Sequence, residues 1–339
     1  MKARLLASIL GGIGVLTLAA SAATAQDVTL KYAHPTSANS SGGLMATDFK
    51  TELEALSGGT MKVQIFPDGQ LGGLSELNEL AASGAVQITA NTWGSLGSFD
   101  EEAGALDAPY VFANSTERYE LITNPKSKIM AELNERLAAS NSGLRVIAPV
   151  DVSGRQTTCN KAVYSPKDLE GVRFRAIPFP VFTATVEGMG AIAVPIEYNE
   201  LTTALATGLV DCQENPLSNV LNDKLYEAQT HIMLTNHILA GGPLLVNAEL
   251  YASLSDQHRQ WLDKAALAAT RKSLERSSAA EATQRTKLEA LGLKFIGPEE
   301  GLDIPAFKVG VAKKMKEAFG DKYDRMFKMI EDERAALLN

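Results

Sequence analysis

The sequence has little of the chemistry that metalloproteins and hydrolytic enzymes use. Its 339 residues include two cysteines and four histidines, and His34, His231, His237 and His258 show no metal-ligand spacing with the cysteines. It contains neither a G-x-S-x-G motif nor a phosphate-binding glycine loop. The sequence therefore predicts no metal site, no cofactor and no enzymatic activity.

Basic clusters are also missing. Acidic residues outnumber basic residues by 40 to 32, for a formal net charge of -8, and no run of lysine or arginine interrupts this balance. Nucleic acids and anionic membranes attract basic surfaces, so they are poor partner candidates. If such an acidic protein binds an anion, it needs a local positive site that faces inward.

Long apolar runs are confined to the start of the chain. Lys2 and Arg4 precede an apolar run over residues 5–20, and Ala23-Thr24-Ala25 has the A-x-A pattern of a cleavage site. This pattern predicts a secretory signal peptide that is cleaved after Ala25. The run is short and rich in glycine and alanine, which argues against a membrane anchor. We expect a periplasmic mature chain with no stable membrane insertion.

Hydrophobic periodicity predicts two successive βαβαβ units, and therefore an α/β fold with helices on the sheet faces. The first unit alternates strands and helices at residues 28–34, 44–56, 61–66, 75–82 and 85–90. Segment 91–109, rich in glycine and acidic residues, is expected to be a loop across the mouth of the domain. A helix over 114–137, broken at Pro125, and a strand at 144–150 complete this part.

The second unit alternates in the same way up to residue 235. Its expected elements are 172–175, 181–189, 191–194, 197–207, 210–214, 217–228 and 231–235. A strand at 244–247 is expected to return to the first sheet. A short strand at 293–296 and helices at 304–319 and 323–338 are expected to end the chain.

One predicted helix is unusually long. Residues 256–291 contain no proline or glycine, Ser255 is a candidate N-cap, and Gly292 follows the helix. At 1.5 Å per residue this helix would be roughly 50 Å long, which exceeds the width of one domain. Its apolar residues keep no heptad repeat, so a spine across two domains is preferred over a coiled-coil arm.

The stretch from Gly154 to Asn215 carries the best candidate for an anion site. Three predicted strands direct Arg155, Arg175 and Asn215 toward one place. A guanidinium group is planar and permanently charged, and it holds a carboxylate through two parallel hydrogen bonds. The alternative for each arginine is a structural salt bridge or a solvated charge at the end of a strand.

The two cysteines, Cys159 and Cys212, lie in this same stretch. An even number in an exported protein favours a disulfide, and two buried free thiols are the alternative. A rival hypothesis is a secreted hydrolase in which Cys159 or a serine is the nucleophile and His237 the base. Neither cysteine has a local catalytic signature.

Several motifs resemble those of the substrate-binding proteins of TRAP (tripartite ATP-independent periplasmic) transporters, of the C4-dicarboxylate-binding type. They are Gly69-Gln70-Leu71-Gly72, residues 107–112, Gly154-Arg155-Gln156-Thr157-Thr158, residues 168–175, residues 210–216 and Thr235-Asn236-His237. These motifs, in this order, cover nearly the whole mature chain.

The resemblance implies a periplasmic-binding-protein fold of two α/β domains, with a ligand cleft between them and a long helix across both. The expected division is 26–150 with 238–255 for the first domain, 151–237 for the second, 256–292 for the spanning helix and 293–339 for a C-terminal segment across both. The implied function is capture of a small organic acid for delivery to a permease driven by an ion gradient. A monomer is expected, and a ligand-binding partner of a membrane sensor is the alternative with this fold.

The resemblance also assigns residues to the ligand. Arg175 is expected to pair with the carboxylate, Arg155 to assist and Asn215 to reach the same group. Other expected ligand-binding residues are Trp93, Thr92, His34, Phe179, Tyr198 and His237, with aromatic walls that include Phe182. The cysteines replace small or polar residues of the family motifs, which favours a Cys159–Cys212 bond. The acid itself is left open among C4-dicarboxylates, 2-oxo acids, aromatic acids and sugar acids.

Overall fold

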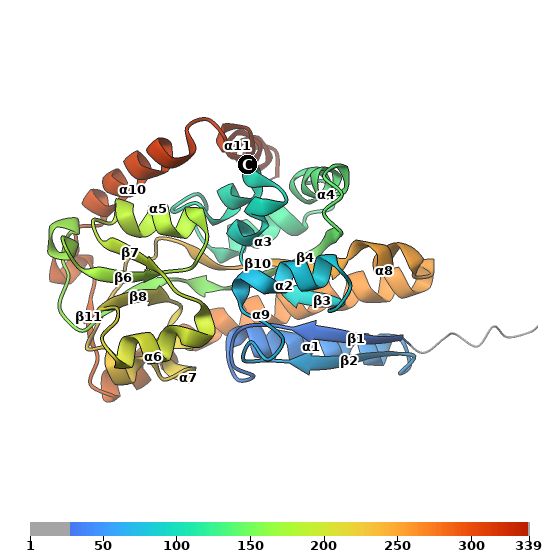
Figure 1. Ribbon diagram of the computed structural model, residues 1–339, viewed down its shortest axis with the longest axis horizontal. Helices are drawn as coiled ribbons and strands as arrows, with labels where there is room; N and C mark the ends of the chain where they lie inside the picture. Colours follow the sequence, from blue (N-terminus) through green and yellow to red (C-terminus); the bar gives the residue numbers. More distant parts are fainter. Residues whose placement is uncertain (1–27, 338–339) are drawn as a thin grey trace, which may run out of the picture.

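The computed structural model describes residues 28–337, so the predicted signal peptide lies outside the described residues. Within this range the strands form a five-stranded and a six-stranded sheet, and helices cover both (Figure 1). The first sheet and its helices lie on the right in Figure 1, and the second sheet lies on the left. The predicted α/β fold class is therefore confirmed.

The first sheet mixes parallel and antiparallel strands. Its spatial order is β2 (Met61–Phe66), β1 (Val28–Ala33), β3 (Ile88–Ala90), β10 (Leu239–Asn247) and β4 (Leu144–Gly154). β1 is parallel to β2 and β3, whereas β10 is antiparallel to β3 and β4. This confirms the predicted return of the chain to the first sheet. The helices packed on it are α1 (Ser41–Leu56), α2 (Leu74–Ala82), α3 (Ser115–Thr123) and α4 (Ile129–Ala139).

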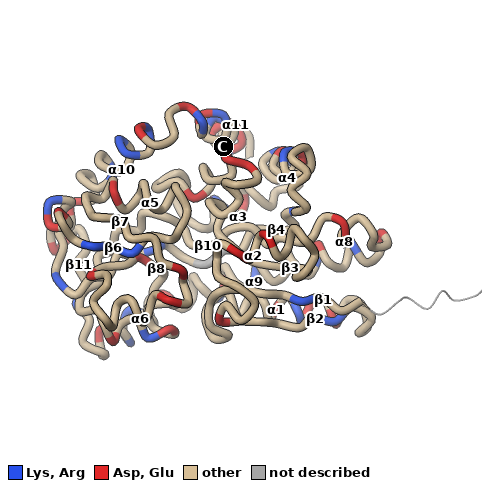
Figure 2. The backbone as a smooth tube through the Cα atoms, in the orientation of Figure 1, with Lys and Arg blue, Asp and Glu red and all other residues tan. Residues whose placement is uncertain are grey.

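The second sheet brings the Gly154–Asn215 stretch together. Its order is β11 (Lys294–Ile296), β9 (His231–Met233), β5 (Gln156–Cys159), β8 (Cys212–Asn215), β6 (Arg173–Ala176) and β7 (Ile192–Pro195). The antiparallel register of β5 and β8 places Gln156 opposite Asn215 and Cys159 opposite Cys212. Basic β6 runs beside acidic β8 (Figure 2). The helices of this second half are α5 (Pro180–Gly188), α6 (Leu201–Ala206) and α7 (Leu217–Asn222).

The chain crosses between the sheets along β4 and β10. These strands pair antiparallel as far as Leu239 opposite Gly154, so β4 extends beyond the predicted end at residue 150. At Gly154 the crossing is tight, because a Cβ there would lie 1.5 Å from the Asn236 side-chain oxygen. Any larger residue there would require the Asn236 side chain to move. The domain boundaries near residues 150 and 238 stay a prediction.

The long helix α9 (Asp256–Ala290) has 35 residues and contacts both halves of the molecule. The first half is the part built around the five-stranded sheet, and the second half is the part built around the six-stranded sheet. The Ser255 side chain accepts a hydrogen bond from the His258 backbone N–H at 3.2 Å, as expected for an N-cap. α9 packs on α1 and β4 of the first half and on α7 of the second. The predicted spine is therefore confirmed. Helices α10 (Ile304–Phe319) and α11 (Asp324–Leu337) follow it, with α10 packed on α5 and α11 on α3.

The prediction of a loop for residues 91–109 is wrong. The segment forms two 3-10 helices, η1 (Trp93–Ser98) and η2 (Glu101–Asp107), whose apolar side chains lie in the core. The Asp107 carboxylate accepts the Gly94 backbone N–H at 2.8 Å and so joins the two helices. Buried small residues such as Ala103 and Ala105 allow this close packing.

Smaller differences concern the helices of the second half. The predicted helix 217–228 divides into α7 and η5 (Leu225–Ala228), because Lys224 has a positive φ of 55° that an α-helix does not admit. The predicted helix 197–207 divides into η4 (Tyr198–Glu200) and α6. A short helix, α8 (Ala248–Ser253), had no predicted counterpart.

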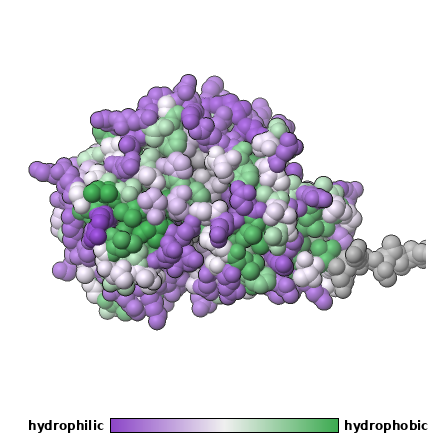
Figure 3. All heavy atoms as spheres, viewed as in Figure 1, coloured by the Kyte–Doolittle hydropathy of each residue, from purple (hydrophilic) through white to green (hydrophobic). Residues whose placement is uncertain are grey.

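The surface is mostly hydrophilic, with separate apolar areas on the face shown in Figure 3. Charges of both signs alternate along the outer helices (Figure 2). Over residues 28–337, no helix combines the length and the apolar character that crossing a bilayer requires.

Candidate functional site

A cavity of about 110 Å³ lies between the two halves of the molecule. The first half contributes His34, Asn91 and Thr92, and the second contributes Arg155, Tyr198 and Asn215. His34 follows β1 and Asn91 follows β3, and these strands are parallel. Since the carboxyl ends of parallel strands meet at one edge of a sheet, their side chains face the same opening.

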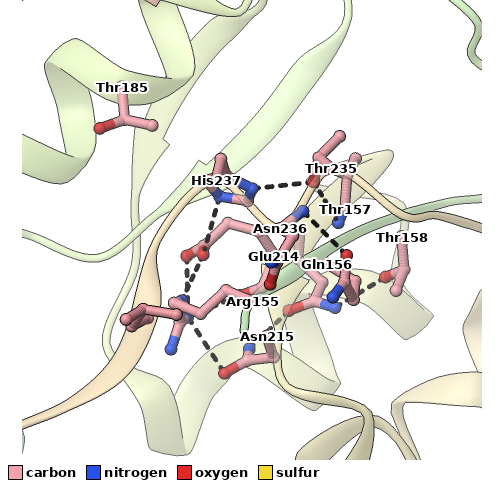
Figure 4. A network of polar contacts seen from close by, with 12 residues as sticks. Arg155, Gln156, Thr157, Thr158, Thr185, Glu214, Asn215, Thr235, Asn236 and His237 are labelled. Atoms are coloured by element: carbon pink, nitrogen blue, oxygen red, sulfur yellow. Dashed lines mark hydrogen bonds and ion pairs between the residues drawn. The ribbon is translucent and has the colours of Figure 1, made fainter. Parts of the chain in front are cut away.

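Arg155 is paired within the protein. Its guanidinium donates through Nη2 to Glu214 Oε1 at 2.8 Å and through Nε to Glu214 Oε2 (Figure 4). Nη2 also donates to Asn215 Oδ1 at 3.1 Å. Burial by itself would raise the pKa of Glu214, but Arg155 and His237 outweigh burial and lower that pKa to about 2. Glu214 is therefore ionised at neutral pH and compensates the charge of Arg155.

A hydrogen-bond network holds this pair in place. Asn215 Nδ2 donates to Gln213 Oε1 at 2.5 Å, and Gln213 Nε2 donates to Thr158 Oγ1 at 2.7 Å. On the other side, His237 Nε2 lies 3.3 Å from Glu214 Oε2. Figure 4 shows the Arg155, Glu214 and His237 side chains directed at one another. Such a network limits the freedom of the Arg155 side chain.

Arg175 is a buried arginine of a different kind. Its Nε donates to the Ile196 carbonyl at 2.9 Å, but among the described residues neither Nη1 nor Nη2 has a hydrogen-bond partner. The side chain has no exposed surface, and its guanidinium carbon lies 5.9 Å from the centre of the Tyr198 ring. Burial lowers the pKa of Arg175 to about 10, so the group stays charged at neutral pH. A buried cation with two free donors is a strong anchor for an anion.

Further polar atoms near the cavity lack a partner among the described residues. They are His34 Nε2 and Thr92 Oγ1, whose residues line the cavity, and Trp93 Nε1 of the residue that follows Thr92; all three atoms are buried. Burial lowers the pKa of His34 to about 4, so its ring is neutral at pH 7. Because buried polar groups are nearly always hydrogen-bonded, a polar ligand or a water molecule would satisfy these atoms.

Asp107 is a buried carboxyl group behind the site. Burial raises its pKa to about 7, against the opposing effects of the Gly94 N–H, Arg118 and Arg155. The unfolded chain keeps the ordinary value of 3.8. Burying the ionised carboxylate therefore lowers the free energy of unfolding by its full amount above pH 7. This destabilisation decreases as the pH falls and is absent below about pH 3.8.

We expect Asp107→Asn to be more stable than the wild type at pH 8, because the amide oxygen still accepts the Gly94 N–H without a buried charge. The difference should shrink as the pH falls to 4. Urea denaturation of both proteins at each pH measures it, and the comparison cancels the other carboxyl groups. A variant that is less stable at pH 8, or a difference independent of pH, would contradict this assignment.

Cys159 and Cys212 form a disulfide with an S–S distance of 2.05 Å, as predicted. Cys159 therefore has no thiol to act as a nucleophile, which removes that form of the hydrolase hypothesis. Among the described residues, no group of histidine, cysteine and acidic side chains is arranged to hold a metal ion.

The comparison with protein families decides the class of the chain. Residues 32–326 match the model of bacterial extracellular solute-binding protein, family 7. The chain belongs to this family. Its relatives are solute-binding proteins, which confirms the expectation that this family 7 protein is not an enzyme.

Three similar proteins show how far the likeness extends. The C4-dicarboxylate-binding periplasmic protein DctP of Rhodobacter capsulatus is 29% identical over 78% of this chain and 79% of its own. A TRAP periplasmic solute-binding protein from a Bordetella species, with ligand density interpreted as pantoate, is 28% identical; the match covers 91% of this chain and 98% of that one, with a TM-score of 0.81. A third, from Polaromonas sp. JS666 with bound D-erythronate, is 26% identical, with coverages of 90% and 98% and a TM-score of 0.82.

The structure of this family 7 protein brings most of the predicted residues to one place. His34, Thr92, Arg155, Tyr198 and Asn215 line the cavity. Arg175, Trp93 and His237 are buried but do not line the cavity. Arg175 lies 5.9 Å from the ring centre of Tyr198, and His237 Nε2 lies 3.3 Å from Glu214 Oε2. Their roles in binding stay predictions.

The structure places three of the expected residues in other surroundings or pairings. Phe179 precedes α5 and lines two other surface depressions, beside Pro180 and Phe319, instead of the cavity. Phe182 is buried in the core. Arg155, expected as the second carboxylate clamp, is already paired with Glu214.

Sequence reasoning missed Glu214, Asn91 and Glu197. A charged residue within the strand 212–215, all of which is buried, is the signal that could have identified Glu214, since buried charges need partners. The Glu197 carboxylate reaches across to the first half, where it accepts the backbone N–H groups of Leu74 at 2.7 Å and Ser75 at 3.2 Å. No sequence pattern indicated that contact.

Proposed function

We propose that this chain is an extracytoplasmic solute-binding protein that captures a small organic acid and delivers it to a TRAP-type permease. The observation that carries the proposal is Arg175, a fully buried guanidinium with two terminal nitrogens that have no partner among the described residues. It lies 5.9 Å from the ring centre of Tyr198, which lines the cavity. A carboxylate that accepts from both nitrogens would satisfy the donors and compensate the charge. Asn215 and the neighbouring polar groups complete the binding site.

The relatives support this ligand class. The three relatives above are described as binding C4-dicarboxylates, as having density interpreted as pantoate, and as bound to D-erythronate. Each of these compounds carries a carboxylate. The structural relatives are described as TRAP periplasmic proteins, which supports a TRAP permease as the membrane partner. A signal peptide cleaved after Ala25 would export the protein to the periplasm, where it would act as a monomer.

Contacts between the two halves support a ligand-dependent closure of the domains 26–150 with 238–255 and 151–237. The Glu197 carboxylate caps the N-terminus of α2. Ser41 Oγ donates to Ser218 Oγ at 3.1 Å, and Asn222 Nδ2 donates to the Asn39 carbonyl at 3.0 Å. Apolar residues of the second half, including Ile177, Val181 and Phe182, also pack in one cluster with residues of the first half. The ligand would add its own contacts to these and so favour the closed form.

The test is a thermal-shift screen of the purified protein against organic acids and their neutral amides, such as lactate with lactamide. We expect at least one acid to raise the melting temperature, since a ligand far above its dissociation constant stabilises the folded state. Its amide, which lacks the negative charge, should not. If no acid shifts the melting temperature, or if amides act as well as acids, the proposed function is wrong.

A further inference from the structure

Helix α2 of the first half has no N-cap side chain of its own. Gly73 occupies the N-cap position, so no side chain there can accept a hydrogen bond. The Glu76 side chain accepts the Gly73 backbone N–H at 3.1 Å, but the N–H groups of Leu74 and Ser75 have no acceptor within α2. No carbonyl precedes the first N–H groups of a helix, so they need partners from outside it. α2 therefore depends on a cap from another part of the chain.

Glu197 supplies this cap from the second half. Its Oε2 accepts the Leu74 N–H at 2.7 Å, and its Oε1 accepts the Ser75 N–H at 3.2 Å and the Ser75 hydroxyl. A carboxylate at this end of a helix also interacts favourably with the helix dipole. Leu74 and Glu197 are 123 residues apart in the sequence, and α2 lies at the border between the halves (Figure 1). The cap can therefore form only when the two halves meet.

The glycine-rich turn before α2 leaves room for the Glu197 side chain. A Cβ at Gly73 would lie 2.9 Å from Glu197 Oε2 and 3.0 Å from the carboxyl carbon, so a larger residue would require the carboxylate to move. The φ of Gly73 is −76°, which other residues adopt freely, so the approach of Glu197 is what favours glycine here. A Cβ at Gly69, in the same turn, would lie 3.4 Å from Asn199 Nδ2. The turn thus receives the segment that contains Glu197.

The neighbours of Glu197 belong to the candidate site. The Ile196 carbonyl accepts the Arg175 Nε–H at 2.9 Å, and Tyr198 lines the cavity. On the side of the first half, Leu74 lines the cavity as well. Glu197 itself is not among the described residues that line it. Its carboxylate therefore joins a wall residue of the first half to the backbone beside a wall residue of the second.

We propose that Glu197 is a positioning residue that latches the two halves together and so sets the lifetime of the bound state without touching the ligand. The Glu197 latch is the set of hydrogen bonds from Leu74 and Ser75 to the Glu197 carboxylate. It rests on the proposed function in one respect, that an acid held at Arg175 favours the closed form. Because the latch ties Leu74 to the residue before Tyr198, these two walls cannot separate until it breaks.

The kinetics of Glu197→Ala test this latch. The probe is whichever of pantoate, D-erythronate and succinate raises the melting temperature most, and surface plasmon resonance measures both rates. We expect the dissociation rate to rise about 3- to 30-fold, as for loss of a helix cap, while the association rate changes less than about twofold. Glu197→Gln, which keeps one acceptor oxygen without the charge, should lie between. A dissociation rate of Glu197→Ala within about twofold of the wild type would overturn the proposal.

Two further variants separate the latch from a general effect of substitution. The control is Glu200→Ala in the same short helix, where the side chain is exposed and has no hydrogen bond or ion pair among the described residues; both rates should stay unchanged. Gly73→Ala should speed dissociation in the wild-type background, because its methyl group displaces the Glu197 carboxylate. In the Glu197→Ala background it should have little effect. Equal effects of Gly73→Ala in both backgrounds would contradict the contact as its cause.

Hydrogen–deuterium exchange on a peptide that contains residues 73–77 observes the latch directly. The N–H groups of Glu76 and Leu77 donate to the Gly73 carbonyl, both at 3.1 Å, so loss of the latch should expose only the amides of Leu74 and Ser75. We expect faster exchange at these two positions in Glu197→Ala than in the wild type, with the same acid present. Equal exchange would overturn the latch.

The exchange measurement also separates the latch from the proposed function. If none of the three acids binds, exchange is compared between the two proteins without ligand. Faster exchange of Leu74 and Ser75 in Glu197→Ala would then support the latch, and the thermal-shift screen would decide the proposed function by itself. Equal exchange in the ligand-free proteins would overturn the latch whatever the screen shows.

Discussion

Replacing Arg175 with alanine is expected to weaken binding of the best acid by roughly thirty- to several-thousand-fold, or about 2 to 5 kcal/mol. The variant leaves the carboxylate of the ligand buried and unpaired, because Arg155, the only arginine among the described residues that line the cavity, is held by Glu214. Isothermal titration calorimetry of both proteins with the same acid measures the loss.

Two further variants separate the charge from the shape of the side chain. Arg175→Lys keeps a positive charge but loses the planar fork, so it should bind more weakly than the wild type. Arg173→Ala removes an arginine of the same strand whose side chain is 47% exposed and paired with Asp211, and it should bind like the wild type. Binding by Arg175→Ala within about threefold of the wild type would mean that Arg175 is not the anchor.

The second large effect concerns stability. Replacing both Cys159 and Cys212 with alanine should lower the free energy of unfolding by about 4 kcal/mol, because the disulfide closes a loop between cysteines 53 residues apart and so restricts the unfolded chain. Both cysteines are fully buried, so the double variant also avoids leaving one unpaired thiol in the core. Urea denaturation of the oxidised wild type and the variant gives the difference.

The reduced wild type is the matched control, and its stability should approach that of the double variant. Thiol titration of the unreduced, denatured wild type should find no reactive thiol. Two reactive thiols in protein purified from the periplasm, or equal stability of all three samples, would show that the disulfide is absent or contributes nothing.

Elements with a strong local pattern could be predicted well. The strand Met61–Phe66 matches its predicted range, and α9 ends within one residue of the predicted end. Both depend on neighbouring residues: alternation in the strand, and an N-cap followed by a long run without proline or glycine in the helix. The prediction of a loop for segment 91–109 failed because its helices are held by contacts with residues distant in the sequence. One example is the close approach of Gly104 to Tyr323.

The candidate site shows the same limit. Arg175 could be selected from its place at the end of a strand before two prolines, and the structure leaves its terminal nitrogens without partners among the described residues. Arg155 has an equally suggestive position, yet its partner Glu214 lies 59 residues later and no local pattern joins them. A sequence shows which charges exist, whereas the register of β5 and β8 determines which of them meet.

The most direct test of the central claim is a crystal structure of the protein with the acid that binds most tightly. We expect the ligand carboxylate to accept hydrogen bonds from both Nη1 and Nη2 of Arg175, at about 2.7 to 2.9 Å. The Arg155–Glu214 pair should remain intact beside it. A carboxylate bound to Arg155 with Glu214 displaced, or a ligand that makes no contact with Arg175, would contradict the claim.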